Sequence, residues 1–229
     1  MSTEYAEEDA FFCFANLIAE IEQCFSREFD HAMMDTQNPV GRYQALLALL
    51  DRELFVDLAR KNIDARFYVL RWLSLLFTQE LELPDVLRLW DSLLGDPHRF
   101  RFLLFFACAM VMSVREQILA NEFGPCLMLL QNMPVGDVCQ LIARATQLME
   151  STDPACLEPQ YLAAVYADAM AAAQRTRMHT HTQHRLHQQA APSCPSWVSS
   201  ARAATPRSMH KHRRRRAESE SFLPSFSMK

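Results

Sequence analysis

Residues 65–95 read ARFYVLRWLSLLFTQELELPDVLRLWDSLLG, and this stretch decides the fold that the sequence predicts. In each half, apolar side chains recur at i, i+3, i+4 and i+7, which is the spacing of one buried helix face. These side chains are Val69, Trp72, Leu73 and Leu76 in the first half and Val86, Leu89, Trp90 and Leu93 in the second. The stretch therefore predicts a pair of amphipathic helices.

The boundaries and flanks of this helix pair are also visible in the sequence. Pro84 suits the first turn of the second helix, and Gly95 is expected to end that helix in the left-handed conformation. Phe67 and Leu87 extend the apolar surface beyond a single stripe, which indicates a place inside a larger all-α body. Arg71 and Asp91 are the charged residues embedded in the pair, and their spacing allows a partly buried ion pair.

The same stretch resembles the signature F-x-x-x-R-W-L…E…L-P-D-V-x-x-x-W-D-x-L in the second half of the TBC domain of Rab GTPase-activating proteins. The matching residues are Phe67, Arg71, Trp72, Glu80, Pro84, Asp85, Trp90 and Asp91. The resemblance covers roughly residues 9–150 and includes Phe11 to Phe14 and Arg115-Glu116. It implies an all-α, irregular, right-angled helical array whose partner is a small GTPase of the Rab family in membrane traffic. Contact of Arg71 or Asp91 with that partner is the alternative to their ion pair.

Catalysis in this family resembles phosphoryl transfer assisted in trans. The resemblance implies an arginine from an I-x-x-D-x-x-R motif and a glutamine from a Y-x-Q-G motif, which together stabilise the transferring phosphate and position the attacking water. This sequence holds only fragments: Ile63 to Arg66 has the wrong spacing, and no glycine follows Tyr43-Gln44. We therefore expect the C-terminal portion of a TBC domain, truncated, with no catalytic residues and no enzymatic activity of its own.

Two roles remain open for such a chain. The first is a Rab regulator that docks weakly or not at all in this form. The alternative is a non-catalytic helical interaction module, or an incomplete gene-model fragment. Which Rab is recognised does not follow from the sequence, because specificity depends on surface complementarity.

Composition divides the chain into three parts, which we predict to be a TBC portion at 1–150, an extra helix at 151–175 and a disordered tail at 176–229. The formal net charge is -4, but the tail carries ten Lys and Arg against two Glu, a net +8, which leaves -12 on the rest. Few aliphatic residues occur in the tail, so it cannot bury enough surface to fold. Its basic run, which suits nuclear import or contact with an anionic surface, or else only raises solubility, is Arg213, Arg214, Arg215 and Arg216.

Within residues 8–150 we expect seven or eight helices. A first helix covers 8–28, and the apolar residues between 46 and 58 favour two helices, with Asp51 capping the second. Residues 99–119 are read as a buried central helix, because their uncharged run of 13 residues is too short for a membrane span of about 20. Arg115-Glu116 is expected to end that helix in solvent. Shorter helices are expected at 126–130 and 135–149.

The remaining patterns point away from metal, cofactor and nucleic-acid chemistry. Seven Cys lack any CxxC spacing, which favours reduced thiols. His179 and His181 form a weak chelating pattern in a region where solvated low complexity is the better interpretation. No glycine-rich nucleotide loop is present. Acidic residues such as Glu7 and Glu8 near the start indicate a cytoplasmic protein without a signal peptide, which could lie peripheral to endomembranes.

Overall fold

The computed structural model describes residues 5–21, 38–96 and 99–190, and within these ranges it contains helices and no strand. The all-α prediction is confirmed. The elements are α1 (Ala6–Ile21), α2 (Pro39–Leu50), α3 (Arg52–Arg60), the 3-10 helix η3 (Ala65–Phe67), α4 (Val69–Ser74), α5 (Leu83–Gly95), α6 (Arg99–Ser113), α7 (Arg115–Ala120), α8 (Phe123–Gln131), α9 (Val138–Ser151), the 3-10 helix η4 (Pro154–Leu157) and α10 (Pro159–Ala190).

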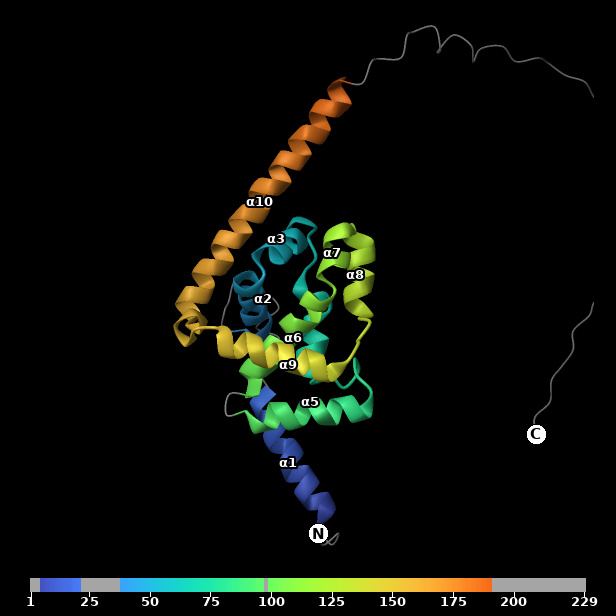
Figure 1. Ribbon diagram of the computed structural model, residues 1–229, viewed down its shortest axis with the longest axis vertical. Coiled ribbons are helices and arrows are strands. Elements are labelled where there is room, and N and C mark those ends of the chain that lie inside the picture. The colour runs from blue at the N-terminus through green and yellow to red at the C-terminus, as the bar shows by residue number, and fades with distance from the viewer. Residues whose placement is uncertain (1–4, 22–37, 97–98, 191–229) are drawn as a thin grey trace, which may run out of the picture. The chain divides into compact units, whose positions relative to one another are not determined.

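The centre of the helical array is α6, as expected. It packs against α2, α4, α5 and α9, and Figure 1 shows α9 crossing it. Every side chain from Phe105 to Val111 is buried, with Phe105 and Phe106 filling space beside the small residues Ala107 and Cys108. In the described ranges no helix has both the length and the apolar character required to cross a bilayer.

The break between α2 and α3 lies at Asp51, where the sequence places it. The side chain of Asp51 accepts a hydrogen bond from the Leu54 amide at 3.0 Å, which satisfies a donor that the first turn of α3 leaves unpaired. Leu54 and Leu58 then fall on the buried face of α3. The prediction of two helices in this region is confirmed.

The turn between the two helices of residues 65–95 has a different structure from the one expected. The first helix stops at Ser74, and Leu76 and Phe77 take positive φ values of 48° and 63°. This strained turn closes through a hydrogen bond from the Phe77 amide to the Trp72 carbonyl at 3.0 Å. Both side chains are buried, and their burial offsets the strain.

The second helix of the pair is α5. Pro84 occupies its first turn, as predicted. Gly95 is the last residue of α5, but no described glycine has a positive φ, so its expected left-handed role is wrong. The chain instead leaves α5 through Asp96 in an extended conformation, which needs no glycine.

Several boundaries differ from those predicted. The stretch 99–119 forms two helices, because the backbone at Val114 (φ -108°, ψ 18°) departs from helical geometry. This break gives nine α-helices, α1 to α9, in the described residues up to Ser151, where about seven or eight were expected. The helix α10 continues past Arg175 to Ala190. The end of the first helix at residue 28 and the basic run Arg213 to Arg216 lie outside the described residues.

Candidate functional site

The signature residues of the helix pair divide into a buried framework and an exposed rim. Trp72 is fully buried, and the indole Nε1 of Trp90 donates to the Leu76 carbonyl at 3.1 Å, which fixes α5 against the strained turn. Phe67, Pro84 and Asp91 lie at the surface, and Asp85 is half-buried in the first turn of α5. Most of the signature therefore holds the two helices together.

Arg71 lies at the junction of α4, the following turn and α8. Its Nε donates to Glu80 Oε1 at 2.7 Å, and its Nη2 donates to the Gln131 carbonyl at 2.9 Å. The Glu80 side chain is only 6% exposed, so this carboxylate depends on Arg71 for its compensating charge. Gln131 is the last residue of α8, where a cation is also favoured by the helix dipole.

The expected ion pair between Arg71 and Asp91 is wrong. The strained turn at Leu76 and Phe77 reverses the chain, and this brings Glu80 back beside Arg71. Asp91 instead lies on the exposed face of α5. Glu80 belongs to the signature, but its pairing could not be read from helical spacing because Glu80 lies in the turn.

A small apolar surface adjoins Arg71. Phe67 is 57% exposed and Leu70 is 36% exposed, although both belong to otherwise buried segments. The Gln131 side-chain amide donates to the Phe67 carbonyl at 3.3 Å, so α8 holds η3 in place. An arginine beside exposed aromatic and aliphatic side chains is a composition favoured at protein interfaces.

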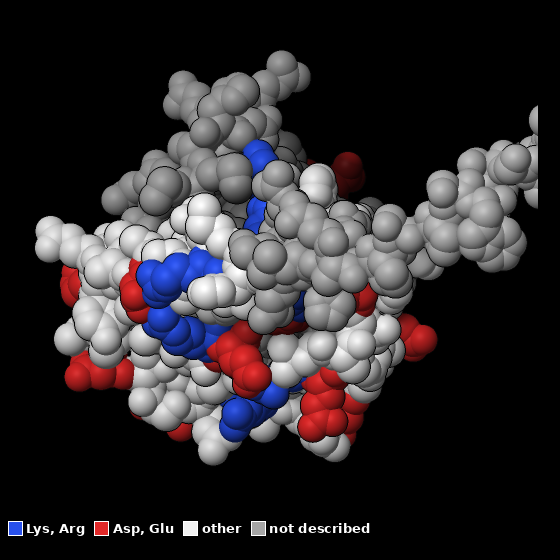
Figure 2. Space-filling model, turned by 90° about the horizontal axis from the view of Figure 1, so that it is seen from above, with Lys and Arg blue, Asp and Glu red and all other residues white. Residues whose placement is uncertain are grey.

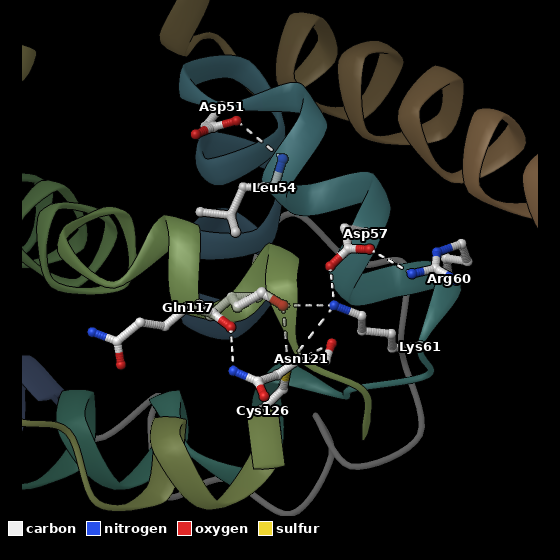
Figure 3. A network of polar contacts seen from close by, with 9 residues as sticks. Asp51, Leu54, Asp57, Arg60, Lys61, Gln117, Asn121 and Cys126 are labelled. Carbon is white, nitrogen blue, oxygen red and sulfur yellow. Dashed lines mark hydrogen bonds and ion pairs between the residues drawn. The ribbon is translucent and has the colours of Figure 1, made fainter. Parts of the chain in front are cut away.

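Lys61 forms a buried polar cluster that sequence reasoning missed (Figure 3). Its ammonium is ion-paired with Asp57, donates to the Ile118 carbonyl at 2.7 Å and lies 3.8 Å from the Cys126 sulfur. One cation thus joins α3, the end of α7 and α8. The available signal was spacing: Lys61 follows Leu54 and Leu58 at i+7 and i+3, on the buried stripe of α3.

The thiol in this cluster is structural. Burial raises the pKa of Cys126, although the Lys61 ammonium acts in the opposite direction, and the sulfur also contacts the Ile118 and Asn121 carbonyls at 3.2 and 3.3 Å. A buried thiol of this kind is chemically inert. The five described cysteines are all free, as expected, and no group of His, Cys, Asp and Glu in the described ranges is arranged to hold a metal ion.

Arg115 does not end a helix in solvent, and that expectation is wrong. Because the chain breaks at Val114, Arg115 opens α7 and faces the start of α3. Its Nε donates to Asp51 Oδ2 at 2.7 Å, and its Nη2 is ion-paired with Glu53. Asp51 therefore caps α3 and anchors α7 at the same time.

The helix α1 exposes a cluster of aromatic side chains. Phe11, Phe12 and Phe14 are 64%, 64% and 61% exposed, whereas Leu17 and Ile18 are half-buried against the core. Such a cluster marks an interaction surface or a source of self-association.

On one face of the molecule, charged side chains of opposite sign are mixed rather than separated. On the face shown in Figure 2, Lys and Arg side chains adjoin Asp and Glu side chains. The ion pairs of Arg115 with Asp51 and of Arg52 with Asp168 follow the same arrangement. Neighbouring charges of opposite sign cancel at long range, so this face does not produce a strong field of one sign.

Known proteins match more than half of this chain. A model of the Rab-GTPase-TBC domain family matches residues 2–119. Human TBC1 domain family member 13 is 44% identical over 148 residues, which cover 65% of this chain and 37% of that protein. The mouse protein of the same name is 43% identical over the same length. Human TBC1 domain family member 5 is 31% identical over 174 residues, 66% of this chain and 22% of that protein. The chain thus spans well under two thirds of each relative, and it belongs to the RabGAP-TBC family of Rab GTPase activators.

Proposed function

We propose that this chain interacts with a Rab GTPase but does not by itself accelerate GTP hydrolysis. The observation that carries this proposal is a combination: the family match is to a Rab-GTPase-TBC domain, yet the sequence contains neither the I-x-x-D-x-x-R nor the Y-x-Q-G motif. An arginine supplied to a GTPase in trans is worth about 10³ to 10⁵ in rate. A chain without this arginine can bind a Rab GTPase and still leave its rate of GTP hydrolysis unchanged.

Arg71 supports this separation of binding from catalysis, because it is the arginine of the signature and its guanidinium is already bound within the chain. Its Nε and Nη2 bind Glu80 and the Gln131 carbonyl. A catalytic arginine must place its charge on the transferring phosphate, and moving Arg71 there would leave the nearly buried Glu80 carboxylate unpaired. Arg71 thus acts as a scaffold residue in this proposal.

Docking would use the exposed apolar surface beside Arg71. Phe67 and Leu70 offer side chains that bury well against a partner, and the Phe67 carbonyl is held by α8. We place this interaction in the cytosol, peripheral to the endomembranes on which membrane traffic takes place. The affinity is expected to be weak, because two side chains are fewer than a typical interface supplies.

The test is single-turnover GTP hydrolysis on a panel of Rab proteins, with a TBC domain that carries both motifs as the positive control. We expect rates equal to intrinsic hydrolysis for every Rab. Stimulation by the purified chain that is lost in Arg71→Ala but retained in Arg88→Ala would overturn both the proposal and the scaffold role of Arg71. Docking is measured separately, by biolayer interferometry with Phe67→Ser as the variant expected to weaken it.

A second candidate, a helical interaction module unrelated to nucleotide state, is favoured by the exposed Phe11, Phe12 and Phe14 of α1. The two candidates differ in what they bind. A Rab regulator discriminates between the GTP-bound and GDP-bound partner, whereas such a module does not. Equal affinity for both nucleotide states, lost on substitution of the α1 phenylalanines, would favour the module.

A further inference from the structure

A cavity of about 360 Å³ lies where α10 meets α2, α3 and the segment that leads into η3. Its walls are mainly apolar and come from elements distant in sequence: Leu47, Phe55, Leu58, Ile63, Tyr166 and Met170. The rings of Phe55 and Tyr166 meet edge to face, with centroids 5.6 Å apart, so α10 contributes an aromatic wall. Pockets of about 300 to 1,000 Å³ with apolar walls and few polar groups are the usual sites of small organic ligands.

Two tyrosines with hydroxyl donors are among the residues that line this cavity. Tyr43 and Tyr68 both line it, both are buried, and their hydroxyl oxygens lie 3.2 Å apart. One hydroxyl donates to the other, which leaves the second proton for another acceptor. Burial raises the pKa of both tyrosines above the ordinary value, so both hydroxyls keep their protons at physiological pH.

The charges at the cavity favour an uncharged ligand. Among the residues that line it there is no Lys or Arg, and Asp64 is the one carboxylate. Asp64 accepts from the Arg66 Nε and Nη2 at 2.9 and 2.6 Å, so its charge is already balanced. A charged ligand would lose hydration without gaining a free counter-charge from the lining.

We propose that this cavity binds a small, uncharged, aromatic molecule that carries one hydrogen-bond acceptor. The aromatic edges of Phe55 and Tyr166 face its ring, and the free tyrosine hydroxyl donates to its acceptor. Because Tyr166 and Met170 belong to α10, bound ligand also favours the docked position of this helix. Phe67 of the docking surface proposed above also lines this cavity, so the two proposed sites share one residue, although this proposal does not rest on Rab binding.

The probe for this site is prodan, an uncharged naphthalene with a carbonyl acceptor, whose emission shifts to the blue in an apolar environment. We expect saturable one-to-one binding to the full chain with a blue shift. Ala59→Trp places an indole at the cavity wall and should weaken binding at least tenfold. Met170→Trp fills the cavity from the α10 side and serves as a second, independent variant, with circular dichroism to check that both remain helical.

The acceptor and the location are tested separately. The double variant Tyr43→Phe/Tyr68→Phe should weaken prodan severalfold but leave N-phenyl-1-naphthylamine, which lacks a carbonyl, unchanged. Phe11→Ser/Phe12→Ser removes the exposed aromatic cluster of α1 and should leave prodan binding intact. The proposal is overturned if binding does not saturate, if both tryptophan variants bind prodan like the natural chain, or if the α1 variant abolishes binding.

Discussion

Lys61 shows how one buried cation can determine a local arrangement of helices. Its ammonium is almost fully removed from water, a large desolvation cost that only close partners offset. Asp57 balances the charge, and the Ile118 carbonyl near the end of α7 accepts a hydrogen bond from the ammonium in addition to those from the Asn121 amide and the Cys126 thiol. The side chain thus serves at once as an ion-pair partner and as a helix cap.

Replacing Lys61 by methionine is therefore expected to destabilise the fold strongly. The change leaves Asp57 and the Ile118 carbonyl without the ammonium, although Asp57 keeps Arg60 at 2.8 Å. We expect a loss of about 3 kcal/mol in the free energy of unfolding, measured by urea titration. The matched change Arg60→Met, at a more exposed position, should cost less than about 1 kcal/mol. Equal effects of the two variants would contradict the role assigned to Lys61.

Asp64 gives the fold a pH dependence whose sign follows from its contacts. Burial alone raises the pKa of this carboxyl, but the hydrogen bonds and charge of Arg66 outweigh it, so the pKa lies below the ordinary value of 3.8. A lowered pKa in the folded state means that the stabilisation is present at neutral pH and is lost as the pH falls below about 4. Asp64→Asn should keep the cap of η3 but lose this acid-dependent part.

The measurement for Asp64 is the urea midpoint between about pH 6 and about pH 2. The variant should show a shallower decline with acid than the natural chain. Asp91→Asn, at an exposed carboxylate of α5, is the matched control and should follow the natural chain. Identical slopes for Asp64→Asn and the natural chain would refute the proposed linkage.

At the scale of helices, the sequence was informative where one local rule decides the outcome. Asp51 caps α3 and Pro84 opens α5, because both depend on the backbone of the next few residues. The strained turn at Leu76 and Phe77 could not be foreseen, since tertiary burial of these two side chains overrides their preference for negative φ. Gly95 was expected to end α5 in the left-handed conformation, but the chain at the end of this helix needs no left-handed residue.

The partners of charged side chains were harder to predict than the helices that carry them. Arg71 and Arg115 were both noted in the sequence, yet each pairs with a carboxylate on the far side of a bend in the chain. Hydrophobic periodicity does not give the direction of such a bend. Lys61 was overlooked because a lysine at the end of a helix is usually solvated. The cavity beneath α10 could not be predicted from the sequence either, because it depends on how α10 approaches α3.

The docking of α10 rests on buried apolar side chains rather than on charge. Leu162, Tyr166, Ala169 and Ala173 are buried, whereas the ion pair of Arg52 with Asp168 is well exposed and contributes little. Ala169→Glu places a carboxylate on the buried face and should release the helix. We expect at least tenfold faster amide hydrogen exchange in residues 160–178. Ala167→Glu, one of the exposed positions of the same helix, should leave exchange unchanged; equal exchange in both variants would show that α10 does not depend on this face.

For the molecule as a whole, the described residues pack around α6 but leave α1 largely exposed. The residues of α2 to α10 share one buried cluster, to which the described side chains of α1 add only the half-buried Leu17 and Ile18. Three phenylalanines on one short helix are more than a monomer in water usually leaves uncovered. The unpaired surface of α1 should therefore dominate the solution behaviour of the chain.

We accordingly expect the purified chain to self-associate, with an apparent mass that rises with concentration in size-exclusion chromatography with light scattering. Substituting Phe11, Phe12 and Phe14 by serine removes the exposed apolar area without touching the core, so the variant should elute as a monomer and keep its helical circular dichroism. Glu8→Ser, also exposed on α1, is the control and should associate like the natural chain. A natural chain that remains monomeric at all concentrations would show that these phenylalanines are tolerated in water, and α1 would then carry no argument for a binding partner.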